Sequence, residues 1–230
     1  MLIIPVIDVR HGLAVRAVRG DRSNYQPLVT PLAASADPVD VARGYMQLFP
    51  FKALYIADLD GIEGRGENSD LLRQVREDAG AAEVWVDNGA SAFPSNFSPS
   101  IRRVLGSESL ASGIPKDARA SRDWILSLDF RGDEFQGPRE ILDDAGTWPD
   151  RVIVMTLARV GANEGPDYAR LKSIITRAGS RQVFAAGGVR GRDDLLALRE
   201  AGAAGVLVAS ALHDGKIKTG DLREIAGESF

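Results

Sequence analysis

Short apolar runs recur along the chain, separated by longer segments in which apolar residues follow a helical spacing. The runs with the length of a β-strand span residues 2–7, 53–57, 83–86, 103–105, 124–128, 152–155, 182–185 and 205–208. They are continuously apolar rather than alternating in polarity, which is typical of parallel strands covered on both faces. The pattern therefore predicts eight buried parallel strands.

Helices are predicted between most of these strands. One begins at residue 37, and the others span residues 68–78, 138–145, 166–178, 192–201 and 220–226. Asp37 and Pro38 are the residue types expected at a helix N-cap and first turn. Four glycines occupy expected C-cap positions: Gly80, Gly146, Gly179 and Gly202. Strands alternating with helices in this way predict a series of βαβ units.

The series repeats after about half of the chain. VIDVRHG (6–12) matches SLDFRGD (127–133), and strands three and four of the first half have counterparts at 184–190 and 205–212. Two half-barrels, at about 1–120 and 121–230, would close into one (β/α)8 TIM barrel domain over residues 1–230. The alternative is an open, doubly wound sheet with chance similarity between the halves.

The repeat is least regular after strands three and four. Residues 91–101 contain two prolines and little helical pattern, and residues 107–119 are interrupted by Pro115. Proline disrupts a helix interior, so we expect shortened helices or loops in both places.

Two aspartates end equivalent strands of the two halves. Asp8 follows strand one and Asp129 follows strand five. Active sites of such barrels lie at the C-terminal ends of the strands, where these two side chains would face each other across the mouth. Two opposed carboxylates in different environments can act as a general base and a general acid. The alternative is that each aspartate caps a loop or pairs with Arg10 or Arg131.

Small residues after strands seven and eight predict a phosphate site. Gly187 and Gly188 would let backbone amides approach an anion, and Ala209 and Ser210 offer further amides and a hydroxyl. Tight βα turns without a ligand are the alternative reading.

The equivalent place in the first half has a mixed character. Gly106 and Ser107 keep the small, hydroxyl-bearing turn, and Asn88 could donate hydrogen bonds to an anion. Asp87, however, would repel a phosphate at this position. A second phosphate site is therefore left open.

Three further residues are candidates for the substrate site. Asp58 ends strand two, Thr156 ends strand six, and Arg19 precedes a long polar loop at residues 20–28. A long loop on a barrel is typical of a lid or substrate arm, although it can also be a solvated excursion.

Composition excludes several classes of function. The chain of 230 residues has no cysteine and two histidines, which excludes disulfides, thiol nucleophiles and a histidine-rich metal site. The net charge of −4 disfavours a general nucleic-acid binder. Nothing resembles a signal peptide or a spanning segment, so a cytoplasmic protein without membrane association is expected. No motif predicts a metal or an organic cofactor.

Several stretches resemble one known family, the histidine-biosynthesis isomerase and cyclase family (HisA/HisF). They are IIPVIDVRHGLAVRAVRGD, ADPVDVARGY, YIADLDGIEGRGEN and AAGGVRGRDDLLALREAGAAGVLVASALHDGKI. The resemblance covers nearly the whole chain, is weakest over residues 89–120, and is closer to the isomerase, ProFAR isomerase.

The resemblance implies an Amadori rearrangement of a bisphosphate held at two phosphate sites. It makes Asp8 the general base and places Asp129 on the strand-five aspartate, which is a catalytic partner in the cyclase and lines the site in the isomerase. Glycines 187 and 188 with residues 209 and 210 would form one phosphate site, and Gly106 and Ser107 part of the other.

Two departures from the isomerase pattern affect this expectation. DNGAS (87–91) stands where a glycine-rich run is expected after strand three, and Val160 stands where the general acid is expected after strand six. The departures favour a divergent relative of the type found in methanogens and methylotrophs, which is associated with tetrahydromethanopterin-linked one-carbon metabolism. An ordinary histidine-biosynthesis isomerase and a non-catalytic protein that binds a phosphorylated metabolite are the alternatives.

Overall fold

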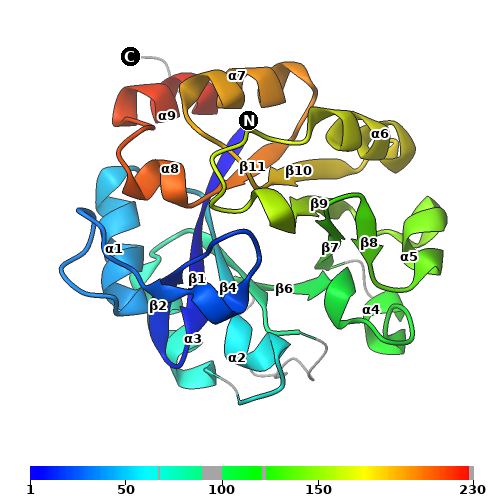
Figure 1. The fold of residues 1–230 in the computed structure, drawn as a ribbon, viewed down its shortest axis with the longest axis horizontal. Helices are drawn as coiled ribbons and strands as arrows, with labels where there is room; N and C mark the ends of the chain where they lie inside the picture. Colours follow the sequence, from blue (N-terminus) through cyan, green and yellow to red (C-terminus); the bar gives the residue numbers. More distant parts are fainter. Residues whose placement is uncertain (67, 90–99, 121–122, 228–230) are drawn as a thin grey trace.

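The computed structural model describes residues 1–66, 68–89, 100–120 and 123–227 and contains a closed barrel (Figure 1). Its parallel strands are β1 (Leu2–Arg10), β4 (Ala53–Asp58), β5 (Glu83–Asp87), β6 (Ile101–Gly106), β7 (Trp124–Arg131), β9 (Arg151–Thr156), β10 (Gln182–Ala186) and β11 (Gly205–Val208). They follow one another around the barrel in chain order, and β11 closes it by pairing in parallel with β1. The eight predicted strands and the TIM barrel are confirmed, and the open sheet is excluded.

Helices cover the outside of the barrel (Figure 1). The longer ones are α1 (Pro38–Leu48), α3 (Ser69–Asp78), α6 (Tyr168–Ala178), α7 (Arg192–Glu200) and α9 (Thr219–Ala226). Short ones are α2 (Leu59–Ile62), α4 (Lys116–Ala120), α5 (Arg139–Asp143) and α8 (Ser210–His213). The predicted start of α1 is confirmed, because the Asp37 carboxylate accepts a hydrogen bond from the Val39 N–H at 2.8 Å.

The predicted helix over residues 138–145 is too long. It ends at Asp143, and a 3-10 turn, η3 (Ala145–Thr147), follows. The Asp144 side chain caps this turn by accepting a hydrogen bond from the Gly146 N–H at 2.9 Å, so Gly146 lies within the turn and is not a C-cap. The other three glycines have the positive φ angles expected of helix ends. The helix after strand four is short, as predicted, and residues 91–99 lie outside the described residues.

Two antiparallel hairpins that the sequence pattern did not predict extend the repeat. β1 pairs with β2 (Leu13–Arg16), which pairs with β3 (Gln26–Pro27), and β7 pairs with β8 (Glu134–Gln136). Both candidate catalytic aspartates belong to these antiparallel pairs: Asp8 is paired with Val15, and Asp129 is paired with Gln136. The same device therefore follows the first strand of both half-barrels.

Large side chains fill the interior of the barrel on the N-terminal side of the strand ends. Trp85 of β5 meets Phe184 of β10 edge to face, with ring centroids 5.0 Å apart. At the N-terminal end of the strands, Glu83 forms ion pairs with Arg102 at 3.2 Å and Arg151 at 2.7 Å. This end of the barrel is therefore packed, and the pocket described below lies toward the C-terminal ends of the strands.

None of the helices in the described part of the chain is both long enough and apolar enough to span a membrane.

Candidate active site

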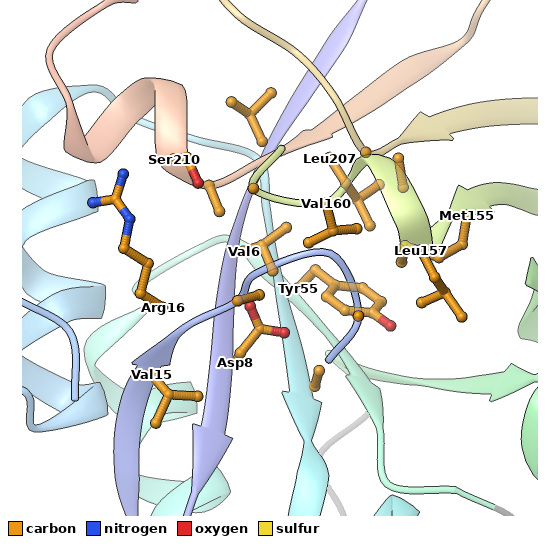
Figure 2. A pocket seen from close by; sticks show the side chains of 18 of the residues that line it. Val6, Asp8, Val15, Arg16, Tyr55, Met155, Leu157, Val160, Leu207 and Ser210 are labelled. Carbon is orange, nitrogen blue, oxygen red and sulfur yellow. The ribbon is translucent and has the colours of Figure 1, made fainter. Parts of the chain in front are cut away.

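A pocket opens at the C-terminal ends of the barrel strands (Figure 2). Six of the predicted site residues line it together: Asp8, Asp129, Gly187, Gly188, Ala209 and Ser210. They come from β1, β7 and the loops after β10 and β11, so the barrel brings together residues from both halves of the chain. Concave sites of this kind, with a few polar groups in an apolar wall, are typical ligand sites.

Asp8 and Asp129 lie on opposite sides of this pocket. Their strands, β1 and β7, are separated by three strands in either direction around the barrel. Neither carboxylate forms an ion pair with its neighbouring arginine in the described structure: Arg10 lies 3.8 Å from Glu63, and Arg131 donates to the Gly20 carbonyl at 3.5 Å. The alternative in which these arginines neutralise the two aspartates is therefore wrong.

Asp129 is buried and held by hydrogen bonds. Its carboxylate accepts from the Ser127 hydroxyl at 2.6 Å, the Glu108 N–H at 3.1 Å and the Ser107 hydroxyl at 3.3 Å. Burial, together with the nearby Glu108 and Asp87 charges, raises its pKa to about 8 despite these donors. Asp129 therefore retains a proton at neutral pH and can act as an acid.

Asp8 has fewer partners. Its side chain points from β1 into the pocket (Figure 2), and the described residues donate no hydrogen bond to it. Burial raises the pKa of Asp8 to about 7, and the positive charge of Arg22 opposes the shift. A carboxylate with this pKa is substantially ionised at neutral pH and can accept a proton.

A third carboxylate, Asp87, enters the same pocket. Its oxygens accept hydrogen bonds from the Gly89 N–H at 3.0 Å and the Tyr55 hydroxyl at 3.4 Å. Burial raises the pKa of Asp87 to about 6. Between the two strand ends, a Cβ on Gly106 would lie 2.9 Å from Asp87 and 3.1 Å from Asp129, so glycine leaves room for both carboxylates.

Tyr55 is a site residue that the sequence analysis missed. Its ring rises from β4 into the pocket beside Asp8 (Figure 2), and its hydroxyl donates to Asp87. Burial and the surrounding carboxylates raise its pKa well above the usual value, so the phenol stays protonated. Its position in the strand could have identified it, because Ala53, Tyr55 and Ala57 are every second residue of β4 and therefore share the face that points into the barrel.

The raised pKa of Asp129 predicts a pH-dependent stability. The folded protein keeps this proton up to about pH 8, whereas the unfolded chain releases it near 3.8, so this contribution to the free energy of unfolding falls as pH rises between these values. Relative to Asp129→Asn, which cannot titrate, the wild type should lose about 1.4 kcal/mol per pH unit in this window. Urea unfolding at pH 5, 6 and 7 measures the difference.

The matched control for this experiment is Asp193→Asn, whose side chain is fully exposed. Its difference from the wild type should stay constant over the same pH range. A constant difference for Asp129→Asn as well would contradict the buried, protonated state of Asp129.

The loops after β10 and β11 form the pocket wall across from Asp87 of β5. Gly187 and Gly188 have φ angles of 100° and 87°, and a Cβ on them would lie 2.6 Å from the Thr156 carbonyl and 2.3 Å from the Gly165 carbonyl. Only glycine fits this close backbone packing. The Ser210 hydroxyl faces the same space (Figure 2).

The other predicted site residues lie outside the pocket lining. The Ser107 hydroxyl is fully buried and binds Asp129, and Asn88 is buried behind the Asp87 strand end. Asp58 caps α2 and accepts from the Asn68 amide at 2.7 Å. Arg19 is exposed and pairs with Glu164 at 2.9 Å.

Thr156 is buried with its side chain on the face of β9 opposite to Met155, which lines the pocket. Val160 does line the pocket, at the place where the sequence comparison expects an acid (Figure 2). The Val160 side chain contributes only methyl groups to the pocket and cannot transfer a proton.

The segment after β2 covers part of the mouth. Arg22, in the 3-10 turn η1 (Arg22–Asn24), reaches across the barrel to form an ion pair with Glu108, which follows β6. Arg10 donates to the Arg22 carbonyl, and Tyr25 of the same segment lines the pocket. This loop has the position of a substrate arm or lid, which is the role expected from its length.

Comparison with known proteins places this site in a family. A family model described as histidine biosynthesis protein matches residues 2–96 and 144–218. An uncharacterized protein of Methanocaldococcus jannaschii is 29% identical over 98% of this chain and 97% of its own length. Imidazole-4-carboxamide isomerases whose names include two phosphoribosyl groups are 26% identical in Thermococcus kodakarensis and 29% in Ruminiclostridium cellulolyticum.

These isomerases match over nearly their whole length: the alignment covers 98% and 97% of this chain and 97% and 98% of theirs. The family model spans both half-barrels and the strand ends that carry Asp8, Gly187 and Ser210. The chain belongs to the histidine biosynthesis (HisA/HisF) protein family.

Proposed function

We propose that this chain is an isomerase that moves protons within a phosphorylated sugar or aminosugar-type metabolite, with Asp8 and Asp129 as its base and acid. The observation that carries the proposal is the placement of two carboxylates, with pKa values raised to about 7 and 8, across one pocket. The negative charges of Glu108 and Asp87 favour the protonated form of Asp129, whereas the positive charge of Arg22 favours the ionised form of Asp8, so the acid is assigned to Asp129 and the base to Asp8.

An Amadori-type step fits these roles without a co-reactant. Asp8 would remove a proton from the carbon next to the reacting centre, while Asp129 would deliver its proton to the oxygen or nitrogen that gains electron density. The product has the same atoms as the substrate, and a second proton transfer restores both carboxyl groups. General acid and base groups of this kind each contribute on the order of a hundredfold to ten-thousandfold in rate.

Phosphate binding is proposed at the loops after β10 and β11. Gly187 and Gly188 present backbone without side chains, and the Ser210 hydroxyl faces the pocket. Arg16 and Lys216 also line this end and supply positive charge, although both lie near Asp214, at 2.7 and 3.7 Å. Phosphoribosyl groups in the names of the related isomerases agree with a phosphorylated substrate.

We further infer a metabolic role outside ordinary histidine biosynthesis, in one-carbon metabolism linked to tetrahydromethanopterin. The support is the pair of departures from the isomerase pattern, the carboxylate of Asp87 and the methyl groups of Val160, both in the pocket.

Complementation of a histidine-auxotrophic strain that lacks the isomerase separates the two roles. We expect no growth, because the general acid expected at position 160 is absent. In parallel, the purified protein is incubated with a phosphorylated-metabolite extract and followed by mass spectrometry, where one phosphorylated compound should convert to an isomer of equal mass. Growth would return the chain to histidine biosynthesis, and binding of a metabolite without conversion would make it a non-catalytic binding protein.

A further inference from the structure

The pocket mouth is electrostatically divided. Asp8, Asp87 and Asp129 project from β1, β5 and β7, and Glu108 follows β6. Across the mouth from Asp87, the loops after β10 and β11 bring glycines, Ser210 and Lys216, together with Asp214, which pairs with Lys216 at 3.7 Å. The two ends therefore suit ligand groups of different charge.

None of the three aspartates forms an ion pair with a cationic side chain among the described residues, although the positive charge of Arg22 is close enough to act on Asp8 and Asp87. Asp87 and Asp129 are 6% and 4% exposed, and the hydrogen-bond donors that reach them from the described residues are neutral. Asp8 points into the same space without a hydrogen bond from the described residues. Carboxyl groups in a buried site without an ion-pair partner are costly to ionise, and a ligand cation or donor is bound strongly under this condition.

Two arginines at this end are already engaged. Arg22 forms its ion pair with Glu108, and Arg131 donates to the Gly20 carbonyl at 3.5 Å near the mouth. Neither lies within ion-pair distance of Asp87 or Asp129 in the described residues. A phosphate placed between these two aspartates would meet the buried carboxylate of Asp87, the buried carboxyl group of Asp129 and the Tyr55 phenol, which is turned toward Asp87.

We propose that the substrate has a single phosphate, bound at the loops after β10 and β11, and a protonated amine with neighbouring hydroxyls at the end formed by Asp8, Asp87 and Asp129. The proposal rests on the proposed function for its phosphate end. It differs from a bisphosphate substrate at the other end, where the amine would donate to Asp87 and lie within reach of Asp8 and Asp129.

Three matched probes test the proposal: glucose 6-phosphate, glucosamine 6-phosphate and glucose 1,6-bisphosphate. They share one phosphate and differ in a hydroxyl, an amine or a second phosphate. By calorimetry at pH 7, glucosamine 6-phosphate should bind the wild type roughly tenfold more tightly than glucose 6-phosphate, because a hydrogen bond to a charged group is strong. Glucose 1,6-bisphosphate should bind most weakly of the three.

Asp87→Asn should remove most of the preference for the amine and strengthen binding of the bisphosphate, whereas Asp193→Asn should preserve the wild-type order. Circular dichroism checks that both variants are folded. Equal binding of amine and hydroxyl probes, tightest binding of the bisphosphate, or absence of binding by all three would overturn the inference.

Inorganic phosphate distinguishes this failure from failure of the proposed function. If phosphate competes with glucose 6-phosphate but the amine gives no advantage, the phosphate end stands and the inference on the amine is wrong. If the amine preference is present but phosphate does not compete, the proposed phosphate site at Gly187 and Gly188 is wrong.

Discussion

Asp8→Asn should lower the rate of isomerisation by about a hundredfold to ten-thousandfold and leave the barrel folded. The asparagine has nearly the same shape as the aspartate but cannot accept a proton. Asp8 has no hydrogen bond from the described residues to lose, and its pKa is raised by burial, so the neutral amide should be tolerated or stabilising. The rate is measured on the metabolite that the mass-spectrometric experiment identifies, and thermal unfolding monitors the fold.

The matched control for this substitution is Asp133→Asn. Asp133 lies in the turn of the β7–β8 hairpin, is fully exposed, and pairs with Arg170 at 3.2 Å. It should retain wild-type turnover. Asp129→Asn should lose activity to a similar degree as Asp8→Asn, and normal turnover in both site variants would refute acid–base catalysis by this pair.

A pH profile supplies a second readout of the same pair. The rate should rise as pH increases through about 7, where Asp8 loses its proton, and fall through about 8, where Asp129 loses its own. The active form requires Asp8 ionised and Asp129 protonated. A profile with no dependence on pH between 6 and 9 would contradict these roles.

The barrel could be predicted from the sequence because its signals are local. Each strand is a continuous apolar run, and the resemblance between the segments around Asp8 and Asp129 reveals the half-barrel repeat. Chain order then determines which strands neighbour one another, so the opposition of these two aspartates follows from the count of strands. The hairpins after β1 and β7 were missed because β2 and β8 are short and not uniformly buried.

The electrostatics of the site could not be predicted in the same way. The pKa of Asp129 depends on Asp87, at the end of β5, and on Glu108, in the turn after β6. The sequence does not reveal that these two side chains lie near Asp129. Ser107 illustrates the difficulty: its hydroxyl suits an anion site by residue type, but the structure turns it toward Asp129. Tyr55 belongs to a continuously apolar run, so its side chain looks like part of the core, although it lines the pocket and its hydroxyl donates to Asp87.

Gly188→Ala should destabilise the protein by about 1–3 kcal/mol and weaken phosphate binding at least tenfold. The φ angle of Gly188 is 87°, a region in which a side chain is strained, and its Cβ would lie 2.3 Å from the Gly165 carbonyl. Relief of this overlap requires a shift of the backbone that also positions Gly187 and the start of the loop before α7. Urea unfolding measures the stability, and calorimetry with inorganic phosphate measures the binding.

Gly191→Ala is the control three residues further along the same loop. Gly191 has an extended φ of 173°, and its Cβ would lie at an ordinary 3.6 Å from the Lys216 carbonyl. The cost to stability should stay below about 1 kcal/mol, the usual range for alanine at a helix N-cap, with phosphate affinity unchanged. Equal losses of phosphate binding in both variants would mean that any added methyl disturbs the loop, whereas a loss confined to Gly188→Ala ties binding to the backbone geometry at that glycine.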